Sequence, residues 1–313
     1  MIAIAGAGAF GTALAVALGR EGRAVTLWAR DLGDMAETRR NARYLPGVEL
    51  PETVTVTANS DVFHRAEVVL LAVPMQALDG FVAANAAQFG GKWLVACCKG
   101  VDMATLQGPS AVIRARCPNA QIAVLTGPSF AADIARGLPT ALTLAGADEA
   151  LQARLSTPSL RLYRSADVVG AELGGALKNV MAIAAGVVMG AGLGDSARAA
   201  LMTRGFAEMQ RFALAKGARA ETLAGLSGLG DLILTCTSAQ SRNFRFGQAI
   251  GQEASFDPTI TVEGAATAVA VAKIAQRDGI DMPITQMIAA LIAQEITLRQ
   301  AVQALMSRPL KEE

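Results

Sequence analysis

The sequence contains a single histidine, and its net charge is close to zero. A Ser-His-Asp triad, a multi-histidine zinc site and a His-Asp dehydrogenase pair would each have to use that residue, His64. His64 lies in Asp61–Ala66, a predicted helical turn without a glycine-rich or acidic motif, which favours an exposed structural role. Proton transfer is therefore expected to use Lys, Asp, Glu, Tyr or Cys. With 28 basic and 27 acidic residues, the net charge of +1 gives no general attraction to nucleic acid.

Cysteine is also scarce, and its spacing contains no Cys-x-x-Cys pair. Cys97, Cys98, Cys117 and Cys236 therefore indicate neither a disulfide framework nor a zinc ribbon, and we expect no metal site. Reduced thiols favour a cytoplasmic location.

Long hydrophobic runs are few. The uncharged stretch Met1–Gly19 lacks a basic region and is interrupted by spaced glycines, unlike a signal peptide. The other uncharged run, Asn179–Gly194, falls short of the roughly 20 apolar residues that a membrane span needs. We expect no membrane insertion.

The length of 313 residues predicts about two domains. Apolar runs alternate with helix-length segments in the first half, which is typical of a parallel sheet covered by helices. In the second half, long segments follow the i, i+3, i+4 spacing of helices. We predict a Rossmann-like, doubly wound, mostly parallel α/β domain over residues 1–165 and an all-α domain over residues 166–313. The expected strands are Ile2–Ala5, Ala24–Trp28, Thr53–Thr57, Val68–Val73, Trp93–Cys98, Ile122–Leu125 and Thr140–Ala145, and the expected helices include Phe10–Arg20, Gln76–Phe89, Thr105–Arg116, Val168–Met189, Ser196–Lys216, Val262–Arg277 and Thr285–Leu291.

A Gly-x-Gly-x-x-Gly motif follows the first predicted strand and opens the first predicted helix. Gly6 permits a tight turn, Gly8 allows a pyrophosphate to approach the backbone, and Gly11 brings helix and strand together. The N-terminus of the helix offers N–H groups to the phosphates. This context predicts a dinucleotide site, and the alternative is a glycine-rich turn without a ligand.

Arg30 ends the second predicted strand, where a dinucleotide fold meets the adenosine ribose. An acidic residue there binds the ribose hydroxyl of NAD, whereas arginine pairs with the 2′-phosphate of NADP. Arg30 favours NADP(H), and the adjacent Asp31 keeps NAD(H) open. An exposed arginine at a strand end is the alternative.

Two later strand ends border the same predicted crevice. Lys99 follows the fifth strand and is a candidate ligand for an anionic substrate or the cofactor. Gly127 and Ser129 follow the next strand, although turn chemistry alone also accounts for Gly-Pro-Ser.

Lys178 stands in an apolar Gly/Ala/Val/Met setting in the helical half. Burial there lowers the pKa of a lysine toward the range useful in proton transfer, and the alternative is a side chain that reaches the surface along its alkyl stem. Asp231 follows a glycine-rich turn, and Thr235 is four residues later. Ser241, Arg242 and Asn243 offer donors for a phosphate, although a polar surface loop would look similar.

These motifs together resemble bacterial-type NAD(P)-dependent glycerol-3-phosphate dehydrogenases over nearly the whole chain. The segments that resemble the family are Leu125–Ala131, Gly174–Val180, Gly228–Leu232, Ser241–Asn243 and Val262–Gly264. The resemblance implies an architecture like that of 6-phosphogluconate dehydrogenase.

The resemblance also implies roles for individual residues. Lys178 is the expected proton acceptor, and Asn179 and Thr235 match polar active-site positions. The implied glycerol phosphate site consists of Lys99, Gly127, Ser129, Asp231, Ser241, Arg242 and Asn243, and the implied cofactor contacts are Phe10, Arg30, Lys99, Ala131, Arg242 and Glu263.

The resulting hypothesis is a cytoplasmic sn-glycerol-3-phosphate dehydrogenase that supplies phospholipid synthesis, with NADP(H) preferred or shared with NAD(H) and Lys178 as general acid and base. The expected partner is a small phosphorylated substrate, and we expect a homo-oligomer, a dimer. Two alternatives stay open. One is a dehydrogenase of similar build acting on a hydroxy acid or nucleotide sugar, and the other is a dinucleotide-sensing protein without chemistry.

Overall fold

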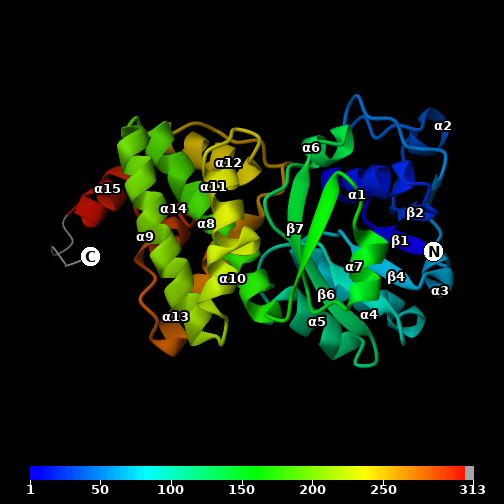
Figure 1. Cartoon of the computed structure of the whole chain (residues 1–313). Coiled ribbons are helices and arrows are strands. Elements are labelled where there is room, and N and C mark those ends of the chain that lie inside the picture. The colour runs from blue at the N-terminus through cyan, green and yellow to red at the C-terminus, as the bar shows by residue number, and fades with distance from the viewer. Residues whose placement is uncertain (307–313) are drawn as a thin grey trace.

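The computed structural model describes residues 1–306 of the chain. Figure 1 shows an α/β part that contains the N-terminus beside a part built only of helices. The last strand ends at Ser165 and the next helix starts at Val168. Residues 307–313 of the predicted second domain lie outside the described residues.

The α/β part contains one eight-stranded sheet with the order β3-β2-β1-β4-β5-β6-β7-β8. All neighbouring strands are parallel except β6 and β7. The chain reverses its direction of winding between β1 and β4, which is the switch point where doubly wound sheets bind ligands. This confirms the predicted fold class. The strands are β1 (Ile2–Ala5), β2 (Val25–Trp28), β3 (Val54–Thr57), β4 (Val68–Leu71), β5 (Trp93–Ala96), β6 (Gln121–Thr126), β7 (Thr140–Ala145) and β8 (Leu160–Ser165).

Strand β8 was not among the sequence-based expectations. Leu160 and Leu162 are buried, whereas Arg161, Tyr163 and Arg164 are exposed. β8 is an edge strand with one wet face, so its alternating pattern differs from the apolar runs of the central strands.

Both faces of the central sheet are buried, and successive residues of β1 point into hydrophobic clusters on opposite faces. Ile2 and Ile4 pack in one hydrophobic cluster with Leu14 of α1. Ala3 and Ala5 belong to the cluster on the opposite face. Because neither face is wet, the central strands contain no polar alternation. The helices of this part are α1 (Ala9–Arg20), α2 (Met35–Thr38), α3 (Val62–Arg65), α4 (Met75–Asn85), α5 (Pro109–Arg116), α6 (Ala131–Arg136) and α7 (Glu149–Leu155), with a short 3₁₀ helix at Ala86–Gln88.

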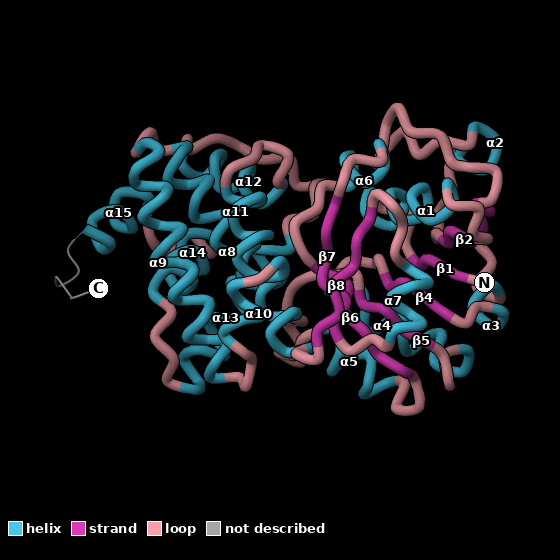
Figure 2. Tube along the Cα trace, in the orientation of Figure 1, coloured by secondary structure: helices cyan, strands magenta, loops and turns pink. Residues whose placement is uncertain are grey.

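The second part surrounds α8, as the tube in Figure 2 shows. The long predicted helices are present, but the shorter ones between Ala220 and Gly251 and the last one were not foreseen. The glycine-rich turn before Asp231 is a π-helical turn, in which Ser227 and Gly228 are buried. The elements are α8 (Val168–Gly190), α9 (Gly194–Ala215), α10 (Ala220–Ala224), the π-turn (Leu226–Gly230), α11 (Asp231–Cys236), α12 (Arg242–Gly251), α13 (Glu263–Asp278), α14 (Pro283–Ile292) and α15 (Leu298–Met306).

Helix α8 is the central element of the helical part. By length and composition alone it could cross a membrane, but 83% of its apolar window is buried inside the protein. It packs against α9, α11, α12, α13 and α14. A helix that is apolar all round and covered by neighbours is a core helix.

Candidate active site

The turn between β1 and α1 has the geometry of a phosphate-binding loop. Gly6 has a φ of +112°, and a Cβ on Gly11 would collide with the carbonyl oxygen of Gly6. A Cβ on Gly8, in contrast, would meet nothing within 4 Å. Gly8 caps α1 without any side-chain hydrogen bond, so the first N–H groups of the helix remain available to an anion. These features fit the pyrophosphate of a dinucleotide.

This turn opens into a cleft of about 1120 Å³ that reaches from the ends of β1 and β2 to the helical part. Most of the predicted site residues share this cleft. Its lining includes Gly6, Gly8, Phe10, Arg30, Lys99, Ser129, Ala131, Lys178, Asn179, Thr235, Ser241, Arg242, Asn243 and Glu263. Gly11 lies inside α1, and Gly127 and Asp231 lie behind Lys99.

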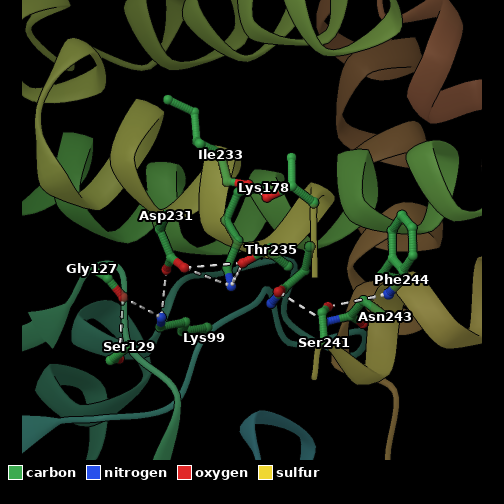
Figure 3. Close-up of polar contacts among 12 residues, drawn as sticks. Lys99, Gly127, Ser129, Lys178, Asp231, Ile233, Thr235, Ser241, Asn243 and Phe244 are labelled. Atoms are coloured by element: carbon green, nitrogen blue, oxygen red, sulfur yellow. Dashed lines mark hydrogen bonds and ion pairs between the residues drawn. The ribbon is translucent and has the colours of Figure 1, made fainter. Parts of the chain in front are cut away.

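Asp231 joins two lysines that come from the two parts of the chain (Figure 3). Its Oδ2 is 2.6 Å from Nζ of Lys99, and its Oδ1 is 3.0 Å from Nζ of Lys178. Lys99 also donates to the carbonyl oxygen of Gly127 at 3.1 Å. Lys178 donates to Oγ1 of Thr235 at 2.8 Å, and Thr235 in turn donates to Oδ1 of Asp231 at 3.1 Å.

Burial and the charge of the ion-pair partner act in opposite directions on the pKa of Lys178 and on that of Asp231. Burial lowers the pKa of Lys178 to about 8 although Asp231 opposes the shift, and Lys99 lowers it further. Burial alone would raise the pKa of Asp231, but Lys178 and Lys99 outweigh it and hold that pKa below its usual range. Lys178 can therefore give and take a proton near neutral pH.

The start of α12 forms the opposite side of the cluster. Oγ of Ser241 accepts from the N–H of Phe244 at 3.2 Å and caps the helix. Asn243 donates to Oδ1 of Asn179 at 2.9 Å and accepts from the N–H of Gly264 at 3.0 Å. The Asn243 amide thus connects α12, α8 and α13, while Arg242 faces the cleft.

Two glutamates of the helical part meet N-termini of helices in the α/β part. Glu172 of α8 accepts from the N–H of Ser110 at 2.6 Å and from its hydroxyl at 3.0 Å, at the start of α5. Glu263 accepts a hydrogen bond from the N–H of Met75 at the start of α4. Burial raises the pKa of Glu263, although the neighbouring Arg242 opposes the shift. Through these hydrogen bonds from helix N–H groups, the two carboxyl groups dock the two parts together.

Two family models match the chain in succession. The model for the NAD-dependent glycerol-3-phosphate dehydrogenase N-terminus matches residues 1–152, and the model for the C-terminus of the same enzymes matches residues 167–303. The chain belongs to the NAD-dependent glycerol-3-phosphate dehydrogenase family. The resemblance inferred from the motifs is confirmed.

Curated relatives in this dehydrogenase family match the chain from end to end. The protein named glycerol-3-phosphate dehydrogenase [NAD(P)+] from Cereibacter sphaeroides is 66% identical over 100% of both chains. The protein of the same name from Paracoccus denitrificans is 62% identical over 100% of this chain and 99% of its own length.

Solved structures of the dehydrogenase family have the same architecture. The glycerol-3-phosphate dehydrogenase of Coxiella burnetii is 36% identical and covers 98% of both chains with a TM-score of 0.93. The structure from Dunaliella salina, at 24% identity and a TM-score of 0.88, covers 99% of this chain and 61% of its own and shares the fold.

The cleft of this family member also contains residues that sequence reasoning missed. Arg40, Asn41, Arg43 and Tyr44 line it from the connection between α2 and β3, and the segment 259–261 lines it from the helical part. Neither segment has periodicity or a glycine motif. The only signal available was the cluster of arginines at residues 39, 40 and 43.

The single histidine and the four cysteines lie outside the Lys178 cluster. His64 is exposed on α3, as predicted, and takes no part in the Lys178 cluster. The four cysteines are free and buried, and Cys97 and Cys98 border the cleft. Burial raises the pKa of Cys97 to about 12, which leaves its thiol protonated. Within residues 1–306, no group of three or more His, Cys, Asp or Glu side chains is placed to hold a metal ion.

Proposed function

We propose that this chain is an sn-glycerol-3-phosphate dehydrogenase that interconverts dihydroxyacetone phosphate and sn-glycerol 3-phosphate with NAD(P)H. The proposal rests on Lys178. Its buried amine has a pKa of about 8 and lines the same cleft as the glycine turn. The names of its curated relatives support the same reaction.

Lys178 performs the proton transfer in this proposal. When dihydroxyacetone phosphate is reduced, its carbonyl carbon C2 gains a hydride, and the ammonium of Lys178 protonates the oxygen. In the reverse direction, the neutral amine removes the hydroxyl proton. The nicotinamide cofactor supplies or accepts the hydride. Asp231 and Thr235 orient the Lys178 amine by hydrogen bonds of 3.0 and 2.8 Å.

The substrate occupies the space between Lys99 and the start of α12. Arg242 is the main phosphate ligand of this proposal because a guanidinium presents several donors to phosphate oxygens. The carboxamide of Asn243 donates one N–H to Asn179 and accepts from the N–H of Gly264. These bonds fix the start of α12, and the second N–H of the carboxamide is offered to the substrate. Gly127, Ser129 and Ser241 complete the site.

The residues that would hold the cofactor run from the glycine turn to the end of β2. Gly6 and Gly8, with Phe10 and Ala131, would hold its pyrophosphate, and Arg30 would hold its adenosine ribose. Glu263, Lys99 and Arg242 would hold the nicotinamide half, which supplies or accepts the hydride. We propose NADP(H) as the preferred cofactor or one shared with NAD(H).

The proposal also includes the cellular location of the enzyme and its oligomeric state. Free buried thiols fit a reducing cytoplasm, where the product would supply phospholipid synthesis. We propose a homodimer as the working form, and analytical ultracentrifugation of the full chain tests it.

One assay tests the reaction directly. The full chain is mixed with NADPH or NADH, and the loss of reduced-nicotinamide absorbance is followed with dihydroxyacetone phosphate and with a panel of 2-keto acids. We expect turnover with dihydroxyacetone phosphate alone. Turnover only with keto acids would identify a different dehydrogenase, and cofactor binding without any turnover would identify a dinucleotide sensor.

A further inference from the structure

The connection between α2 and β3 is anchored at Arg39. Arg39 adopts the left-handed conformation with φ of +57°, and its guanidinium donates to the carbonyl oxygens of Leu50, Pro51 and Val54. These bonds close the connection into a compact loop. Arg39 is thus occupied by backbone and is not available to a ligand.

Asn41 attaches this loop to the glycine turn. Its buried side chain donates through Nδ2 to the carbonyl oxygen of Ala7 and to Oγ1 of Thr12, both at 2.8 Å. Its Oδ1 accepts from the N–H of Tyr44 at 3.3 Å. The carboxamide therefore holds residues 41–44 at the mouth of the dinucleotide cleft.

The two other arginines of the loop, Arg40 and Arg43, differ in whether a carboxylate neutralises them. Arg40 forms an ion pair with Glu49 at 3.3 Å. Arg43 lies over the ring of Tyr44, with Cζ 5.0 Å from the ring centroid, and forms no ion pair with a carboxylate among the described residues. Stacking on an aromatic ring orients a guanidinium without neutralising it.

Arg43 and Arg30 line the same cleft, and Arg30 lies just beyond the end of β2. Two acidic residues, Asp31 and Asp34, line the same cleft. Asp31 accepts from the N–H of Gly33 at 3.0 Å, and neither carboxylate forms an ion pair with Arg30 or Arg43 among the described residues. The cleft therefore presents two guanidinium groups without an ion-pair partner in the described part of the chain. The ribose hydroxyls of NAD need no guanidinium, whereas a pair of guanidinium groups matches a phosphate dianion.

We propose that Arg43 is a second specificity-determining residue, which binds the 2′-phosphate of NADP(H) together with Arg30. The inference rests on the proposed function, since it concerns the adenosine end of that cofactor. Because NAD(H) lacks this phosphate, Arg43 contributes to the binding of one cofactor and not the other.

Two nucleotide fragments isolate this contact from catalysis. Adenosine 2′,5′-bisphosphate and adenosine 5′-monophosphate differ only in the 2′-phosphate, and calorimetric titration of the full chain measures both. For Arg43→Ala we expect the affinity for the bisphosphate to fall about tenfold or more, while that for the monophosphate changes less than about twofold. Arg43→Lys keeps the charge and is expected to recover part of the loss.

The matched control is Arg161→Ala. Arg161 stacks on Tyr163 in the same way, with Cζ 5.2 Å from the ring, but it lies on β8 outside the cleft. It is expected to leave both affinities unchanged. Equal losses for both fragments in Arg43→Ala, or no loss, would overturn the proposal.

The wild-type titrations separate this inference from the proposed function. A wild-type chain that binds both fragments equally would refute phosphate recognition while leaving the dehydrogenase intact in the substrate assay. A wild-type chain that binds neither fragment would overturn the Arg43 proposal, and the substrate assay alone would then decide the proposed function.

Discussion

Glu172 reaches from α8 to the first turn of α5 and holds Ser110 by both its backbone N–H and its hydroxyl. The carboxyl joins the two parts of the molecule a short way along the helix from Lys178. Burial raises the pKa of Glu172 to about 7, although the two hydrogen bonds from Ser110 oppose the shift.

This pKa predicts a pH-dependent stability. The folded protein holds the Glu172 proton more tightly than the unfolded chain, whose carboxyl titrates near 4.5. The contribution of this group is therefore complete below about pH 4.5 and is lost as the pH rises to about 7. Glu172→Gln, which cannot ionise, is expected to gain roughly 1–2 kcal/mol relative to wild type between these values.

Melting temperatures measured from pH 5 to pH 8 check this difference. Glu21→Gln serves as control because Glu21 is exposed at the end of α1. Parallel curves for wild type and Glu172→Gln would show that the carboxyl does not titrate differently in the folded state.

The proposed role of Lys178 predicts opposite pH profiles for the two directions of the reaction. Reduction needs the ammonium form, so its kcat falls above about pH 8, whereas oxidation needs the free amine and accelerates through the same range. Lys178→Met is expected to lose about 10²- to 10⁴-fold in kcat while it binds NADPH normally. Steady-state kinetics and fluorescence titration measure the two effects. Lys273→Met, an exposed change on α13, is the control, and near-normal turnover of Lys178→Met would remove Lys178 from the mechanism.

Substitutions at Gly8 and Gly11 of the Gly-x-Gly-x-x-Gly motif are expected to impair different properties, the first cofactor binding and the second stability. Gly8→Ala places its methyl in open space, so the protein keeps its melting temperature, but the methyl blocks the pyrophosphate. Gly11→Ala collides with the Gly6 carbonyl and is expected to lower the melting temperature by roughly 4–8 °C or more. Calorimetry without and with NADPH separates the two. A stable Gly11→Ala variant would contradict the tight contact between α1 and the turn.

Glu208, which does not line the cleft, is expected to stabilise the helical part. Its buried carboxylate accepts from the N–H of Ile284 at 2.8 Å and from the N–H and hydroxyl of Thr285, at the start of α14. Glu208→Ala leaves these donors unpaired and is expected to cost about 2–4 kcal/mol. Urea unfolding measures the loss, with the exposed Glu221→Ala as control. Unchanged stability would mean that water replaces the carboxylate.

Local patterns made part of this structure predictable. The glycine turn depends on neighbouring residues, and the apolar surroundings of Lys178 indicated its burial. Asp231 could not be paired with both lysines from the sequence, because the cluster joins three segments brought together only by packing of α8 against the sheet. The loop around Arg43 was missed because it depends on one carboxamide, that of Asn41, rather than on a repeating pattern.

The central position of α8 also determines the order in which the protein can be completed during synthesis. Every strand has left the ribosome when α8 emerges, but α9, α11, α12, α13 and α14, which cover it, are all still to emerge. For that interval the nascent chain presents an apolar helix of 23 residues without its partners. Such a surface attracts chaperones and other hydrophobic chains, so the helical half closes only after most of it has been translated.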